Sequence, residues 1–156
     1  MAKESAPADL VECVQRIVDA TNARDFDAVM SFCAPDAVVV ATGMSTSFEG
    51  VAAIRGFIED WIGSYDQLAF EVQDIVDLGA GVVLAVNRLR GRLAGGSGEV
   101  RLRGGWIYEW ADSRIVRLTL YLNPDEARAA AERLPRNGGK RCRRTTYNFS
   151  VGAPNC

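Results

Sequence analysis

The chain has 156 residues, of which 48% are hydrophobic and 24% are charged, and its formal net charge is −2. This composition is typical of a soluble globular protein, and the length suits one domain. No apolar run approaches the roughly 18 residues that span a bilayer, which excludes a membrane helix. Residues 1–10 lack the apolar segment of a secretory signal, so we expect a cytoplasmic protein that does not bind membranes.

The charge is distributed unevenly along the chain. Residues 1–134 hold all 20 acidic and 13 of the 18 basic side chains, whereas residues 135–156 hold five basic side chains and no acid. A nucleic-acid-binding domain would gather positive charge on a folded face, so nucleic acid is not an expected partner. We expect a flexible N-terminus at 1–8, one domain at 9–134 and a basic, disordered tail at 135–156. A short added strand around Tyr147, Phe149 and Val151 is the alternative for the tail.

Metal binding is not expected, because the chain has no histidine and its four cysteines lack the spacing of a metal site. No cofactor is expected either. We interpret the cysteines as reduced thiols: Cys13, Cys33, Cys142 and Cys156.

Two helices are predicted at the start of the domain. Apolar residues recur at a three-four spacing from Leu10 to Thr21, which predicts one buried helical stripe, with Asp9 at its start. Asp25 is a suitable N-cap for a second, shorter helix over residues 26–33.

The next segment is predicted as a strand, a loop and a third helix. Residues 37–42 are rich in β-branched side chains, and residues 43–50 are polar. The third helix begins at Val51, and its spacing turns both Trp61 and Tyr65 inward.

From Gln67 onward the apolar period changes from about 3.6 to 2, which indicates strands. Tight turns rich in Gly, Asp and Ser separate four predicted strands, at 70–76, 81–93, 99–110 and 114–122. They form an antiparallel meander. Gly104 and Gly105, inside the third of these strands, predict a bulge or bend. An Asn-Pro-Asp-Glu helix start at 123–126 closes this unit of an α+β fold.

The third of these strands alternates so that Trp106, Tyr108 and Trp110 face the helices. Aromatic side chains there would form a flat-walled pocket for an apolar or aromatic small molecule. The expected pocket residues are Trp61, Tyr65, Trp106, Tyr108, Trp110 and Arg88. The alternative is that the aromatic side chains simply fill the core.

Arg88 belongs to a row of arginines, with Arg90 and Arg92, on one face of its strand. If that face points inward, Arg88 or Arg90 would anchor an anion or a carbonyl group. If it points outward, the arginines are solvated and meet Glu71 or Glu109 on neighbouring strands, which is the usual outcome for strands with alternate arginines.

The order of these elements resembles the SnoaL-like branch of the nuclear transport factor 2-like superfamily, over about residues 10–132. Three segments carry the resemblance: FCAPDAVVV at 32–40, FEGVAAIRGFIEDW at 48–61 and GGSGEV at 95–100. The resemblance implies a cone in which a strongly curved sheet wraps three helices around a deep, largely apolar pocket. We expect an α+β cone with three N-terminal helices and a curved mixed sheet, and a homodimer that packs sheet against sheet. Members include ketosteroid isomerases, polyketide cyclases, epoxide hydrolases, dehydratases and binding domains, so the fold alone does not identify the function.

The catalytic groups of these relatives are not matched. The hydroxyl donor and the two acids of the isomerases fall at or near Ile17, Ala41 and Trp106. The aspartates of the hydrolases and cyclases and the histidine of the dehydratases have no counterpart, and we expect Asp36 and Asp74 to be turn or surface groups. We therefore expect a small-molecule-binding domain. The alternatives are an enzyme with relocated catalytic groups and a protein-interaction module with a filled cone.

Overall fold

The computed structural model describes residues 9–134, so the predicted flexible N-terminus and basic tail lie outside the described residues. The helices are α1 (Leu10–Asn22), α2 (Phe26–Ser31), α3 (Val51–Gly63) and α4 (Pro124–Arg133), with a short 3-10 turn η1 (Thr42–Met44). The strands are β1 (Cys33–Ala41), β2 (Thr46–Glu49), β3 (Tyr65–Gly79), β4 (Val82–Leu93), β5 (Glu99–Ala111) and β6 (Arg114–Tyr121).

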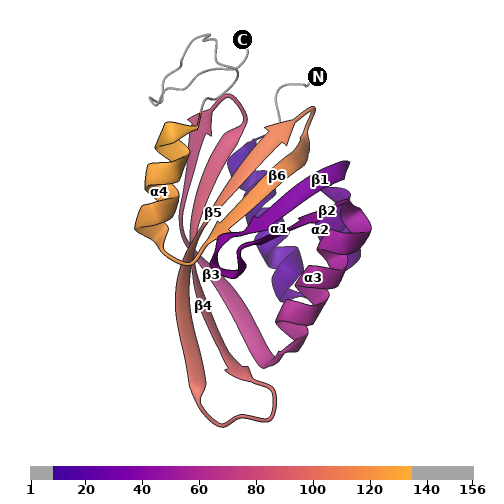
Figure 1. The fold of residues 1–156 in the computed structure, drawn as a ribbon, viewed down its shortest axis with the longest axis vertical. Coiled ribbons are helices and arrows are strands. Elements are labelled where there is room, and N and C mark those ends of the chain that lie inside the picture. Colours follow the sequence, from indigo (N-terminus) through magenta and orange to yellow (C-terminus); the bar gives the residue numbers. More distant parts are fainter. Residues whose placement is uncertain (1–8, 135–156) are drawn as a thin grey trace.

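The six strands form one sheet in the order β2-β1-β6-β5-β4-β3. All neighbouring strands are antiparallel except β1 and β6, which run parallel. The sheet is strongly curved, with α1, α2 and α3 on its concave side and α4 on its convex side (Figure 1). The predicted α+β cone with a curved mixed sheet around three N-terminal helices is therefore confirmed.

Side chains cap the helices where the sequence predicts helix starts. Asp9 accepts a hydrogen bond from the backbone N–H of Glu12 at 3.3 Å, and Asp25 accepts one from Ala28 at 3.1 Å. Asn123 accepts from two backbone N–H groups at the start of α4. These short-range bonds satisfy donors that the helix itself leaves free, which is why local sequence identifies them.

The segment between α2 and α3 differs from its prediction. Helix α2 ends at Ser31 because the Phe32 carbonyl already accepts a hydrogen bond from the Ile115 backbone at 2.8 Å, and β1 begins at Cys33. The polar loop predicted at 43–50 contains β2, which pairs with β1. The one large apolar side chain of β2, Phe48, stacks on Phe57 with ring centroids 4.3 Å apart.

The third helix is shorter than predicted. It ends at Gly63, and Ser64 caps it by donating its backbone N–H to Asp60 and its hydroxyl to the Trp61 carbonyl at 2.6 Å. Tyr65 therefore begins β3 opposite Leu93 and does not belong to the helix.

Of the bulge or bend predicted at Gly104 and Gly105, the bulge is wrong. Pairing with β4 continues in register through both glycines, and the register shift of β5 lies at Glu109 and Trp110, against β6. Gly105 instead allows α4 to approach the sheet, because a Cβ atom at this position would overlap the Ala127 side chain.

Two clusters of buried side chains lie on the two faces of the sheet. The larger lies on the concave side among α1, α2, α3 and the strands. The smaller is formed under α4 by Ala127 and Ala131 with Leu84 and Ile107 of the sheet. Within residues 9–134, none of the helices has the length and apolar character that crossing a bilayer requires.

Candidate functional site

A cavity of about 260 Å³ lies on the concave side of the sheet, between α3 and strands β1, β4, β5 and β6. Helix α3 contributes Phe57 and Trp61, which are four residues apart and therefore share one face of the helix. The strands contribute apolar side chains from their inner faces. The main apolar lining residues are Phe57, Trp61, Leu89, Leu102, Trp106 and Leu120.

Aromatic rings form a continuous wall from β2 across α3 to β5. Phe57 stacks on Trp61 with centroids 6.0 Å apart, and Trp61 meets Trp106 edge to face at 6.4 Å. Phe70 of β3 packs against Trp106 at 5.3 Å. Such rings are rigid and offer large flat surfaces, so the wall suits a planar apolar ligand.

Exposed apolar side chains surround the mouth of the cavity. Met44 is 60% exposed, Leu122 is 66% exposed and Leu102 is 37% exposed, and all three line the cavity. Large apolar side chains gathered at the rim of a hollow are typical of a surface that contacts another molecule.

Few polar groups reach this cavity. Among the described residues that line it, none is Asp, Glu or His. The hydroxyl belongs to Tyr65, because the side chain of Tyr121 packs on the convex face with the cluster under α4. Arg103 also contributes to the lining, but its Nε donates to Gln73 on the convex face at 3.2 Å. The cavity can therefore bind and orient an apolar molecule, but its walls hold no carboxylate or imidazole for proton transfer.

The structure brings Trp61, Tyr65 and Trp106 together at the cavity but leaves the other predicted pocket residues outside its lining. Tyr108 is 1% exposed and lies deeper in the cone, stacked on Trp110. Trp110 packs edge to face on Phe32 at 6.4 Å. Burial raises the pKa of the Tyr108 hydroxyl far above its ordinary value. The side chains of Tyr108 and Trp110 are therefore part of the core.

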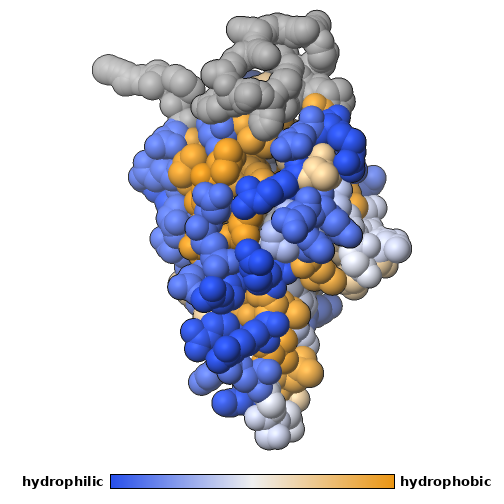
Figure 2. All heavy atoms as spheres, turned by 90° about the vertical axis from the view of Figure 1, so that its left-hand side faces the viewer, coloured by the Kyte–Doolittle hydropathy of each residue, from blue (hydrophilic) through white to orange (hydrophobic). Residues whose placement is uncertain are grey.

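Arg88 lies on the convex face, 45% exposed, with Nη1 3.5 Å from a Glu71 oxygen. The pleat of β4 explains this orientation, because Leu89, the next residue, points into the cavity. On β5, Arg103 lies directly opposite Arg88, as Arg101 lies opposite Arg90. These four arginines surround an open hollow of about 540 Å³. Figure 2 shows the strongly hydrophilic side chains on this side of the molecule, beside a band of hydrophobic ones.

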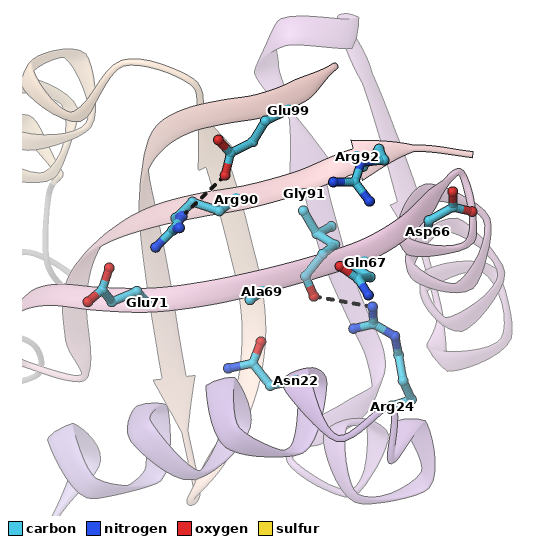
Figure 3. Close-up of a pocket in the computed structure, with 11 residues that line it drawn as sticks. Asn22, Arg24, Asp66, Gln67, Ala69, Glu71, Arg90, Gly91, Arg92 and Glu99 are labelled. Atoms are coloured by element: carbon cyan, nitrogen blue, oxygen red, sulfur yellow. Dashed lines mark hydrogen bonds and ion pairs between the residues drawn. The ribbon is translucent and has the colours of Figure 1, made fainter. Parts of the chain in front are cut away.

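A second polar hollow, of about 540 Å³, lies beside the edge strand β3, where the end of α1 meets it (Figure 3). Several of its charged groups already have partners within the protein. Arg24 donates to the Leu68 carbonyl at 3.2 Å, and Arg90 lies 3.6 Å from a Glu99 carboxylate oxygen. We therefore take the apolar cavity, rather than this groove, as the candidate site.

Sequence reasoning missed the aliphatic part of the cavity wall. Leu120 of β6 and Ala41 of β1 lie directly opposite each other in the parallel pair and both line the cavity. Alternation along β6 could have indicated that Leu118 and Leu120 share a face. Nothing in the strand pattern indicates that β1 is the neighbour of β6, so Met44 and Leu122 had no signal. Ala41 had one only through the resemblance, which places an acid of the isomerases at or near it.

Residues 14–118 match the model of the SnoaL-like domain family. The chain belongs to this family. No curated protein matches the sequence of this SnoaL-like domain.

Solved structures share the fold of this SnoaL-like domain at low sequence identity. A protein of unknown function from Burkholderia pseudomallei, described as NTF2-like, is 15% identical with a TM-score of 0.67, covering 77% of this chain and 95% of its own. A putative SnoaL-like polyketide cyclase from Shewanella denitrificans is 12% identical with a TM-score of 0.65, covering 80% and 97%. A hypothetical protein from Catenulispora acidiphila with a ketosteroid isomerase-like fold, in complex with trimethylamine, is 13% identical with a TM-score of 0.65, covering 74% and 86%. These likenesses support the fold.

Proposed function

We propose that this SnoaL-like domain binds an apolar, aromatic small molecule in the cavity between α3 and the sheet. The observation that supports the proposal is an apolar cavity of about 260 Å³ whose rim exposes Met44 and Leu122. Removing apolar surface from water contributes about 25 cal/mol per Å², so such a ligand would bind through its area alone. The complex of the Catenulispora acidiphila protein with trimethylamine is a further reason to expect a small organic ligand in this fold.

Each part of the wall has a role in this proposal. Trp61 and Trp106 contact the faces and edges of the ligand rings, and Phe57 extends the same wall toward β2. The hydroxyl of Tyr65 orients any polar group that remains near the mouth.

A reaction is not part of the proposal. Ala41 and Trp106 line the cavity at the positions where the resemblance expects the acids of the isomerases, and neither side chain can transfer a proton. Glu109, whose pKa is raised by burial, faces Arg117 on the convex side. It is therefore not available to a ligand in the cavity.

The test uses a two-ring aromatic hydrocarbon, 2-isopropylnaphthalene, with tryptophan fluorescence and thermal unfolding as readouts. Binding should quench Trp61 and Trp106 and raise the melting temperature with ligand concentration, because the ligand binds the folded state alone. Replacing Trp106→Ala should weaken binding by about 1–3 kcal/mol, through the loss of stacked apolar area.

A cavity-filling pair separates binding from stability. Ala41→Leu adds a side chain that occupies the cavity, whereas Ala69→Leu adds the same atoms at an exposed position on β3. The first variant should bind the hydrocarbon at least about tenfold more weakly, and the second should match the wild type. Equal affinity in both variants, or no response of the wild type to the hydrocarbon, would contradict the proposal.

We also propose a homodimer in which the convex faces of two sheets meet. The convex face of β1 and β6 supports this dimer, because Val38, Val40 and Thr119 are only half-buried there. Helix α4 packs on the neighbouring part of that face, at β4, β5 and β6. Size-exclusion chromatography with light scattering at micromolar concentration is the test, and a monomer would contradict the dimer. Val38→Glu should then produce a monomer from a dimeric wild type.

A cytoplasmic location also remains a proposal. Cys33 is a free, buried thiol, and burial raises its pKa, as is typical of an unreactive structural cysteine in a reducing compartment. Fractionation of cells that express the chain would test the location.

A further inference from the structure

Asn87 is a polar side chain in the middle of the apolar concave face. It lies on β4 between Ala85 and Leu89, which point to the same side, and it is paired with Val72 of β3 and Gly104 of β5. Its exposed fraction is 0%, and among the described residues the other buried polar groups include the Thr21 and Tyr108 hydroxyls and the Trp110 indole N–H. Thr21 donates its hydroxyl to the Ile17 carbonyl at 2.7 Å, so its polarity is satisfied within α1.

The amide of Asn87 has no such partner. Within residues 9–134, neither its Nδ2 nor its Oδ1 is hydrogen-bonded to another group of the protein. A buried amide without partners destabilises the folded state, since both atoms have given up hydrogen bonds to water. Leucine has nearly the same size and would avoid this loss, so packing alone does not explain the asparagine.

The position of Asn87 relates it to the cavity. Leu89, two residues along the same face, and Gly104, directly opposite on β5, both line the cavity. Trp106 follows Gly104 on the same face and also lines the cavity, and its ring meets that of Phe70 at 5.3 Å. Because Phe70 and Trp106 are the diagonal neighbours of Asn87 on the two adjacent strands, their rings close over it. Asn87 itself is not among the residues that line the cavity, so the amide lies behind the Trp106 ring, next to the inner end of the cavity.

The indole of Trp106 takes the space that a side chain at position 104 would occupy, beside this amide. A Cβ atom there would lie 3.2 Å from Trp106 Nε1, so the indole rests directly over the glycine backbone. A change of the Trp106 rotamer would join the space around Asn87 to the cavity.

We propose that Asn87 is the polar anchor of this cavity and binds a neutral oxygen group at the buried end of the ligand. Resting on the function proposed above, this inference names the ligand class: an aromatic ring system that carries a ketone or hydroxyl group at the end that enters first. The Nδ2 group donates to a carbonyl oxygen, and Oδ1 accepts from a hydroxyl group. A carboxylate is excluded, because the neighbours of Asn87 on the concave face are apolar and offer no positive charge.

The experiment compares two probes of the same size, 2-acetylnaphthalene and 2-isopropylnaphthalene, by calorimetry and tryptophan quenching. The wild type should bind the ketone about tenfold more tightly than the hydrocarbon, since only the ketone satisfies the buried amide. In Asn87→Leu the affinity ratio should fall to about one, and the melting temperature without ligand should rise. Thr21→Val, which removes a buried hydroxyl of α1 that already has a partner, should retain the wild-type ratio.

Three outcomes would overturn the inference. Equal affinity of the wild type for both probes would mean that the amide does not contact the ligand, as when a buried water satisfies it. A ketone preference that survives in both Asn87→Leu and Asn87→Ala would place the anchor elsewhere, and either result leaves the apolar cavity intact as a binding site. Failure of both probes to bind the wild type would overturn the proposed function and this inference together.

Discussion

Asn22 and Phe70 are joined by two hydrogen bonds, although 48 residues separate them along the chain. The Asn22 amide donates to the Phe70 carbonyl at 2.9 Å, and the Phe70 N–H donates to Asn22 Oδ1 at 2.8 Å. Because β3 is an edge strand of the sheet, this side chain occupies the place where a neighbouring strand would bind. The end of α1 thus both holds β3 and blocks its edge.

Replacing Asn22→Ala should therefore lower stability and expose the edge of β3. We expect a loss of about 1–3 kcal/mol in the free energy of unfolding, because the backbone groups of Phe70 lose a fitted partner. Urea unfolding measures this loss, and light scattering during refolding measures aggregation. Gln15→Ala, which removes an exposed bond to Asp19 on the same helix, is the control and should change neither quantity.

Arg103→Glu should stabilise the protein at low salt. The change would convert the row formed by Glu71, Arg88 and position 103 from one negative and two positive charges to an alternating arrangement. Cross-strand pairs of this kind contribute about 0.2–1 kcal/mol. Urea unfolding of Arg103→Glu and Arg103→Gln at about 20 mM and about 1 M NaCl would measure this electrostatic contribution. The difference in unfolding free energy between the two variants should be smaller at the higher concentration, which screens exposed charges. A difference between the variants that persists at high salt would rule out an electrostatic origin.

Gly105→Ala should destabilise the contact of α4 with the sheet. The added methyl group overlaps Ala127, so α4 must shift, at a cost of about 1–3 kcal/mol. The double variant with Ala127→Gly should recover part of this loss in a double-mutant cycle. Gly56→Ala, in α3 with nothing near its new methyl group, should instead stabilise by about 0.5–1 kcal/mol. Purely additive losses in the cycle would show that the overlap is not the cause.

Glu109→Gln should make stability less sensitive to pH. Burial raises the pKa of Glu109 above its ordinary value of 4.5, and this effect outweighs the opposing effect of Arg117. The folded state therefore binds the proton more tightly than the unfolded state, and the wild type loses stability as the pH rises from about 4.5 through the raised value. Unfolding free energies between about pH 4 and pH 8 should show the variant gaining on the wild type as pH increases. An advantage that instead grows toward low pH would contradict burial as the dominant influence on this carboxyl group.

The parts of the fold that short-range chemistry determines were predicted from the sequence. Asp9, Asp25 and Asn123 cap helices at the predicted starts, and the change of period near Gln67 marks the change from helices to strands. The end of α2 and the strand β2 could not be predicted in this way. Both depend on partners that are distant in sequence, such as Ile115 for the Phe32 carbonyl.

In the candidate site, too, only the features that depend on short-range sequence patterns were predicted. Strand alternation and helical spacing indicated Trp61 and Trp106, and alternation also explains why Arg88 points outward. Tyr108 lies on the same face of β5 as Trp106, yet its side chain is part of the core. Strand alternation predicts the face on which a side chain lies, but not how deep in the cone it lies. Asn87 carried no signal, since one polar residue in a strand becomes informative only when its surroundings are known.

The parallel pairing of β1 with β6 also has a consequence for how the chain folds. The Thr42 hydroxyl near the end of β1 donates to the Leu120 carbonyl of β6, across 78 residues of sequence. During synthesis, the hairpin of β1 and β2 has no neighbour in the sheet until β6 has been made, and a two-stranded hairpin alone is barely stable. The cavity wall that Ala41 and Leu120 share is therefore among the last parts to form, and a chain that stops before Ile115 has helices but no closed cone.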